Sequence, residues 1–226
     1  MTHIFFDLDH TLWDFEANSK ATLVELADEY LAPKGILLEE FFPVYKDINA
    51  ALWKRWSMND IDQATLRVSR FALTLEALKK PDAVLADELS VQYLKRAPFK
   101  TQLMPGALEI LDYLSPKYPL HLITNGFKDA AEVKLKSTPL GSYFQEVIVS
   151  EVFGVQKPHP SIFQFSLEKT GANLEKAWMI GDNLDADVRG PITAGWNAIY
   201  YNHFQQPKPE DIPFEIHHLL ELKKFF

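Results

Sequence analysis

Four short apolar stretches of this sequence each lead into polar residues of the kinds that carry acid–base and phosphoryl chemistry. These residues are Asp7 and Asp9 after the first stretch, Thr124, Asn125 and Gly126 after the second, Lys157 after the third, and Asp182 with Asp187 after the fourth. If the stretches are parallel strands of one sheet, their carboxyl ends meet at a single edge, where ligands bind in open sheets. We therefore expect carboxylates, a hydroxyl, backbone amides and one ammonium to converge there.

The chemistry open to such a set is specific. Carboxylates gathered at one point repel one another and need a hard cation, and oxygen ligands in a chain without cysteine favour Mg²⁺. A carboxylate beside Mg²⁺ can attack phosphorus and form an aspartyl-phosphate. A second carboxyl group two residues on can protonate the leaving oxygen and then activate water. The hydroxyl, the amides and the lysine would hold the phosphoryl oxygens. Each residue alone also has an ordinary interpretation as a cap, turn or surface residue. The occurrence of polar residues after four successive predicted strands favours a catalytic site.

The elements that must position these residues alternate between strands and helices. The apolar runs predict strands at 4–6, 120–123, 147–149, 177–180 and 198–201, and the longer patterns between them predict helices at about 106–116, 127–137, 160–170 and 185–195. Continuous apolar runs are typical of strands buried on both faces. The sequence therefore predicts an α/β fold with a Rossmann-like, doubly wound parallel sheet as its core. The tail from Pro207 is expected to lie against the sheet edge.

One segment interrupts the alternation. From residue 16 to residue 99 the pattern is helical throughout, with four apolar stripes separated by proline-containing breaks. The first of these stripes is Ala21, Val24, Leu26, Ala27 and Leu31. We predict a four-helix cap domain over 16–99, inserted into a core domain made of 1–15 and 100–226.

Composition limits the function classes. The chain has 226 residues, 47% of them hydrophobic and 24% charged, which is typical of an ordered globular protein. A net charge of −8 argues against a nucleic-acid partner, although a small anionic substrate remains compatible with a bound metal ion. The N-terminus has no secretory signal pattern and no stretch approaches a membrane span, so we expect no membrane association and a cytoplasmic location.

The polar strand ends resemble the four motifs of the haloacid dehalogenase superfamily of phosphohydrolases. Asp7-Leu8-Asp9-His10-Thr11 matches the first motif, DxDxT, and Leu122-Ile123-Thr124 matches the second. Lys157-Pro158 matches the third, and the stretch from Gly181-Asp182 to Asp187 matches the fourth, GDxxxxD. The motifs occur in the family's order, and the resemblance covers roughly residues 1–15 and 100–205. The inserted helical segment resembles the superfamily's C1 cap, which closes over the site and excludes water.

The resemblance implies a role for each matching residue. Asp7 would be the nucleophile and a Mg²⁺ ligand, and Asp9 the general acid and base, with its main-chain carbonyl on the metal. Thr124 and Lys157 would bind the phosphoryl group together with Asn125 and Gly126, and Lys157 would also offset the charge of Asp7. Asp182 would be a metal ligand, with Asp187 supporting the metal indirectly or through water. An acid at position 9 favours phosphate ester cleavage over dehalogenation.

Further residues are similar to the pyrimidine 5′-nucleotidase branch, whose members include enzymes acting on noncanonical pyrimidine nucleotides. They are Thr11-Leu12-Trp13-Asp14-Phe15 with Asn18, Thr124-Asn125-Gly126-Phe127, Ser150-Glu151 with Gly154-Val155, and Leu66-Arg67 with Arg70-Phe71. The resemblance predicts a Mg²⁺-dependent phosphatase for pyrimidine nucleoside 5′-monophosphates. Trp13, Phe15, Asn18 and Arg70 are the candidate residues for substrate specificity.

Other functions remain open at this stage. A phosphoglycolate phosphatase, a sugar phosphatase or a sugar-phosphate mutase would use the same motifs on the same fold. A signalling module phosphorylated on aspartate is more remote, because such receiver domains lack a helical insertion and because Asp9 should hasten loss of the phosphoryl group. The sequence leaves open whether the protein is a monomer or a dimer.

Overall fold

The structure, a computed structural model, describes residues 1–58 and 60–226, which form two compact units. Unit 1 consists of Met1–Phe15 and Thr101–Phe226, and unit 2 of Glu16–Lys100. The prediction assigned residue 100 to the core domain, but Lys100 belongs to unit 2. Its ammonium forms an ion pair with Glu25 of the same unit.

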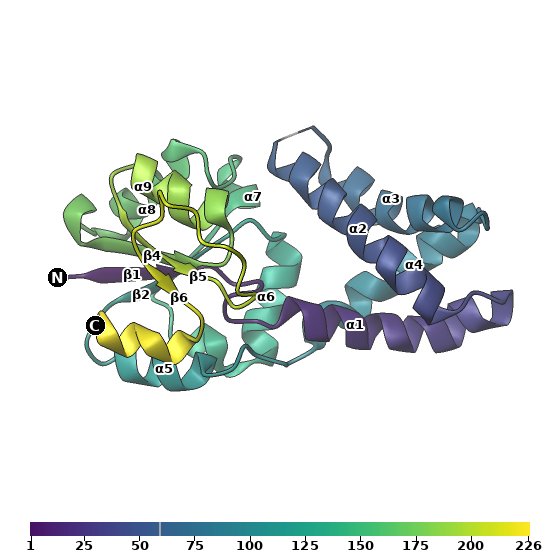
Figure 1. Cartoon of the computed structure of the whole chain (residues 1–226), viewed down its shortest axis with the longest axis horizontal. Helices are drawn as coiled ribbons and strands as arrows, with labels where there is room; N and C mark the ends of the chain where they lie inside the picture. Colours follow the sequence, from purple (N-terminus) through teal and green to yellow (C-terminus); the bar gives the residue numbers. More distant parts are fainter. Residues whose placement is uncertain (59) are drawn as a thin grey trace. The chain divides into compact units, whose positions relative to one another are not determined.

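Unit 1 contains a parallel sheet of six strands in the order β3-β2-β1-β4-β5-β6 (Figure 1). The strands are β1 (His3–Phe6), β2 (Leu120–Thr124), β3 (Glu146–Val149), β4 (Ala177–Gly181), β5 (Asn197–Tyr201) and β6 (Glu215–Ile216). Every neighbouring pair is parallel. The chain leaves β1 toward β2 and β3 and then returns to start β4 on the other side of β1. This order confirms the predicted doubly wound α/β fold and creates a switch point between β1 and β4, where such sheets bind ligands.

Helices cover both faces of this sheet, as Figure 1 shows. They are α5 (Ala107–Leu114), α6 (Lys128–Ser137), α7 (Ser150–Phe153), α8 (Pro160–Thr170), a π-helical turn η6 (Leu184–Arg189) and α9 (Gly190–Thr193). Strand β1 explains why both faces are covered, since Ile4 and Phe6 join the core with α5, whereas Phe5 joins the core with α8. All three side chains are fully buried. A central strand without a solvated face requires the continuous apolar run seen in the sequence.

The C-terminal tail completes the sheet edge, as expected, and adds a strand that the sequence did not reveal. Strand β6 pairs with β5 through Tyr201 and Ile216. The 3₁₀ helix η7 (Leu219–Lys224) follows and buries Leu219 and Leu222 in the core that contains α5. A two-residue strand is too short to produce a recognisable alternation in the sequence.

Unit 2 contains four α-helices among the residues that the structure describes, in agreement with the predicted insertion. They are α1 (Phe15–Leu26), which starts at the boundary, α2 (Leu38–Ser57), α3 (Gln63–Ala77) and α4 (Ala83–Arg96). The predicted face of the first helix was wrong in part. Val24 is exposed, and Leu23 takes its place in the core beside Leu26, Ala27 and Leu31. Within residues 1–58 and 60–226, none of the helices has the length and hydropathy that crossing a bilayer requires.

Candidate active site

Strand β1 places Asp7 at the switch point. The strand ends at Phe6, and the main-chain N–H of Asp7 donates to the carbonyl of Ile180 in β4 at 2.9 Å. This bond continues the sheet pairing by one residue and fixes the aspartate at the carboxyl edge. The Asp7 side chain is almost completely buried, so its carboxylate meets the protein's other polar groups with little water between them.

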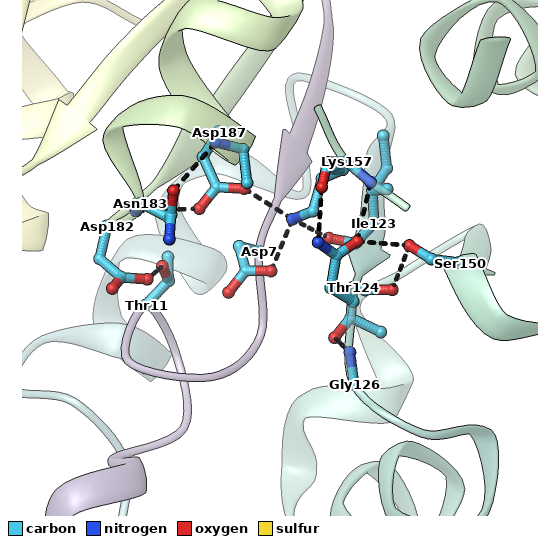
Figure 2. A network of polar contacts seen from close by, with 12 residues as sticks. Asp7, Thr11, Ile123, Thr124, Gly126, Ser150, Lys157, Asp182, Asn183 and Asp187 are labelled. Atoms are coloured by element: carbon cyan, nitrogen blue, oxygen red, sulfur yellow. Dashed lines mark hydrogen bonds and ion pairs between the residues drawn. The ribbon is translucent and has the colours of Figure 1, made fainter. Parts of the chain in front are cut away.

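Lys157 supplies the positive charge at this edge. Its ammonium donates to Asp7 Oδ1 at 2.6 Å, to Asp187 Oδ1 at 2.6 Å and to the carbonyl of Ile123 at 2.7 Å (Figure 2). An ammonium has three N–H donors, and these three acceptors use all of them. Burial disfavours the charged ammonium, but the neighbouring carboxylates of Asp187 and Asp7 outweigh it and raise the pKa of Lys157. The lysine therefore stays charged despite being 1% exposed.

The turn after β4 brings Asp182 and Asp187 to the same place. The Asn183 side chain accepts hydrogen bonds from the main-chain N–H groups of Asp185 and Ala186, which starts the turn of η6. The turn returns Asp187, whose Oδ2 accepts from the Asn183 N–H at 3.1 Å. A Cβ on Gly181 would lie 2.3 Å from Asp187 Oδ2, so this close approach needs glycine.

Three carboxylates thus cluster, with oxygen atoms of Asp7, Asp182 and Asp187 all within 4.8 Å of one another. Burial, and next the charge of Asp187, raise the pKa of Asp7 to about 7 even though Lys157 opposes the shift. Burial, and next the charges of Asp187 and Asp7, raise the pKa of Asp182 well above its ordinary value. One lysine does not neutralise the cluster. An all-oxygen donor set with excess negative charge fits a hard divalent cation such as Mg²⁺.

Thr124, the last residue of β2, places a hydroxyl at the same carboxyl edge of the sheet. The Gly126 N–H donates to Thr124 Oγ1 at 2.9 Å. Because the Thr124 oxygen accepts this bond, its own proton remains available to donate to another oxygen. The threonine is buried at the end of its strand, which fixes the position of the hydroxyl.

A bracing contact missed by the sequence reasoning joins two of the motifs. Asn125 Nδ2 donates to the carbonyl of Lys157 at 2.8 Å, and Asn125 Oδ1 accepts from the Lys157 N–H at 2.9 Å. The single proton of the Ser150 hydroxyl is shared between Asn125 Oδ1, at 2.6 Å from Oγ, and the Thr124 carbonyl, at 2.8 Å. The Asn125 side chain therefore holds the main chain of Lys157, and the phosphate contact expected of Asn125 stays a prediction. In the sequence, the only indication of this contact was that Ser150 and Asn125 are polar residues.

The residues expected to set specificity are divided between the two units, and their contact with substrate stays a prediction. Trp13 is 1% exposed in the core of unit 1, and Phe15 packs half-buried against that core. Asn18 and Arg70 belong to unit 2 and are buried there. The Arg70 guanidinium lies 4.4 Å from the centre of the Tyr93 ring, a cation–π contact.

Asp9 has a partner that the sequence reasoning missed. Lys134 of α6 donates its ammonium to Asp9 Oδ1 at 2.5 Å, and both residues lie in unit 1. The sequence did contain an indication that Lys134 is buried. It lies three residues after Ala131, on the face of the predicted helix that packs against the core, where apolar residues are usual.

The doubly wound fold and the carboxylate–lysine cluster at its carboxyl edge are typical of a hydrolase, and comparison with known proteins agrees on that class. Residues 1–195 match the haloacid dehalogenase-like hydrolase family. Pyrimidine 5′-nucleotidase YjjG of Escherichia coli is 30% identical over 210 residues, 92% of this chain and 89% of the relative. Pyrimidine 5′-nucleotidase PynA of Streptococcus pneumoniae is 30% identical over 226 residues, 97% and 92% of the two chains.

A solved structure gives the same result for the fold. YfnB of Bacillus subtilis, crystallised with bound magnesium, matches with a TM-score of 0.89 at 26% identity, over 99% of this chain and 97% of that one. The chain belongs to the haloacid dehalogenase-like hydrolases and is a phosphatase of that family.

Proposed function

We propose that this phosphatase is Mg²⁺-dependent and hydrolyses pyrimidine nucleoside 5′-monophosphates through a phosphoaspartate on Asp7. The observation that supports the mechanism is the cluster of Asp7, Asp182 and Asp187, in which the buried Lys157 is paired with Asp7 and Asp187. The substrate class is supported by the two nucleotidases that align with nearly the whole chain.

In this proposal, Asp7, Asp182 and the main-chain carbonyl of Asp9 would hold Mg²⁺, which would supply positive charge to offset the carboxylates and the phosphoryl oxygens. The Asp7 carboxylate attacks phosphorus, the phosphorus–ester oxygen bond breaks, and Asp9 gives its proton to the leaving nucleoside oxygen. Asp9 then takes a proton from water as the water oxygen bonds to phosphorus, and the Asp7–phosphorus bond breaks to release inorganic phosphate. Thr124 donates to a phosphoryl oxygen in both steps, and the positive charge of Lys157 beside Asp7 offsets the negative charge of the phosphoryl group.

A phosphate-release assay tests the proposal. The panel contains uridine and thymidine 5′-monophosphates, phosphoglycolate and sugar phosphates, each assayed with Mg²⁺ and with a chelator. We expect the pyrimidine nucleotides to give the highest kcat/KM and the chelator to abolish turnover. A preference for phosphoglycolate or a sugar phosphate would refute the substrate assignment. Transfer of phosphate between hydroxyls without release would identify a mutase.

Two aspartate variants test the nucleophile. Asp7→Asn should remove all turnover while leaving the fold intact, because an amide cannot attack phosphorus. Asp185→Asn is the matched control, since Asp185 lies in η6 near Asp187 but its side chain is 75% exposed and paired with Arg189. Activity of Asp7→Asn near that of the unmodified protein would overturn the mechanism. A phosphorylated Asp7 that persists for hours without turnover would instead indicate a signalling module.

A further inference from the structure

A buried lysine outside the four motifs contacts the proposed acid and base. Lys134 lies in the second turn of α6, the helix that starts just after the Thr124 loop, and its side chain is 8% exposed. The Lys134 ammonium donates to Asp9 Oδ1 at 2.5 Å, across 125 positions of sequence. It also lies 4.1 Å from the centre of the Trp13 ring, so an aromatic face limits where the ammonium can move.

This contact makes the two oxygens of Asp9 different. Oδ1 is held by Lys134, whereas Oδ2 lies on the side of the Thr124 loop. A Cβ built on Gly126 would be 3.2 Å from Asp9 Oδ2 and 3.1 Å from Thr124 Oγ1, so both oxygens border the same small space above the glycine. Asp9 Oδ1 therefore points to the Lys134 side chain of α6, and Oδ2 points toward the proposed phosphoryl site.

Stability alone does not favour a lysine at this position. Burying an ammonium has a large desolvation cost that one carboxylate partner does not reliably recover, and an apolar residue of similar length would fill the space. Lys136 shows the ordinary arrangement on the same helix, since it is 79% exposed and lies 3.9 Å from Glu132. The buried lysine thus points to a requirement on Asp9 beyond the fold.

We propose that Lys134 is a positioning residue that fixes the Asp9 carboxylate so that Oδ2 carries the proton in both steps of the reaction. This inference rests on the proposed function, in which Asp9 protonates the leaving oxygen and later takes a proton from water. Lys134 transfers no proton itself. It removes the rotational freedom of the carboxylate, which would otherwise turn away from the leaving oxygen and the water.

The two steps respond differently to the loss of this positioning, which gives a diagnostic test. p-Nitrophenolate leaves without protonation, so the attack of Asp7 on p-nitrophenyl phosphate should not need Asp9, whereas an alkoxide leaving group should. Hydrolysis of the phosphoaspartate needs Asp9 with either substrate. The comparison uses Mg²⁺-supplemented full-length protein, p-nitrophenyl phosphate, and the alkyl phosphomonoester that the unmodified enzyme hydrolyses best.

For Lys134→Met we expect kcat for the alkyl ester to fall by about 10- to 100-fold with KM nearly unchanged. This loss is smaller than the full contribution of a general acid or base, because Asp9 itself is still present. With p-nitrophenyl phosphate we expect a rapid burst of about one nitrophenolate per active site, followed by slow turnover. Lys134→Arg should lower both rates less than Lys134→Met, because a guanidinium keeps a positive charge beside Asp9. Lys136→Met is the control and should match the unmodified enzyme.

Asp9→Asn separates failure of this inference from failure of the proposed function. If Asp9→Asn hydrolyses the alkyl ester at the unmodified rate, the assignment of Asp9 is wrong. If Asp9→Asn gives the burst but Lys134→Met loses both substrates equally, or loses neither, the positioning role is overturned and the proposed function stands. Lys134→Gln replaces Lys134→Met if the latter does not fold. Failure of both to fold, while Lys136→Met folds, would make Lys134 a structural residue and overturn the inference.

Discussion

Replacing Lys157 by methionine removes one positive charge and keeps a similar side-chain volume. The ammonium lies 2.6 Å from Asp7 and from Asp187, and it is 1% exposed. Removing one partner of a buried ion pair leaves an uncompensated charge and costs about 3–5 kcal/mol. We expect Lys157→Met to lower the free energy of unfolding by about this amount at alkaline pH in the absence of Mg²⁺.

The loss should depend on pH in a defined direction. The pKa of Asp7 is raised from 3.8 to about 7, so the folded protein binds more protons than the unfolded chain between these values, and its stability falls as the pH rises through this window. Lys157 opposes that shift. Without it, the pKa of Asp7 rises further and the window extends above 7. The difference between variant and unmodified protein should therefore be larger at pH 8.5 than at pH 6.

Urea denaturation at both pH values, with a chelator present, measures this difference. Lys169→Met is the control, because Lys169 pairs with Glu146 at 2.9 Å on the surface, with its side chain 38% exposed. Its removal should change stability by less than about 1 kcal/mol. A loss for Lys157→Met below about 1 kcal/mol, or a loss identical at the two pH values, would refute the assignment of Lys157 as the neutralising charge.

Three more perturbations test the described contacts. Gly181→Ala should displace Asp187, because the added Cβ would lie 2.3 Å from its carboxylate; kcat should fall by at least about 10-fold, and an unchanged kcat would contradict the close approach. Burial, and next the charge of His3, lower the pKa of His121 to about 4. The unfolded chain therefore binds the extra proton, and stability should fall as the pH decreases from 6.5 toward 4, a fall that His121→Phe should reduce in acid denaturation curves. Leu89→Ala should destabilise unit 2 by about 2–5 kcal/mol in thermal or urea unfolding, because the leucine is fully buried; a smaller loss would mean that the core collapses around the cavity.

The five longer strands of the sheet could be predicted from the order of the amino acids alone, and so could the polar residues at or after the carboxyl ends of four of them. Each predicted strand is present within one residue at either end, because a strand buried on both faces needs an uninterrupted apolar run. The residues after those strands had to share one edge once the sheet was parallel. Asp7, Asp182 and Lys157 could therefore be expected together from their positions in the chain.

The pairing of these side chains, in contrast, depends on how the elements pack in three dimensions. Lys134 and Asp9 are far apart in sequence, and their contact requires α6 to pack against the loop after β1. Asn125 likewise braces Lys157, a role that its type and position do not distinguish from phosphate binding. Hydrophobic periodicity specifies that a helix face is buried, but not which polar group its neighbour presents there. Such contacts are fixed by packing distances of a few ångströms between elements, and residue order along one chain segment carries no information on them.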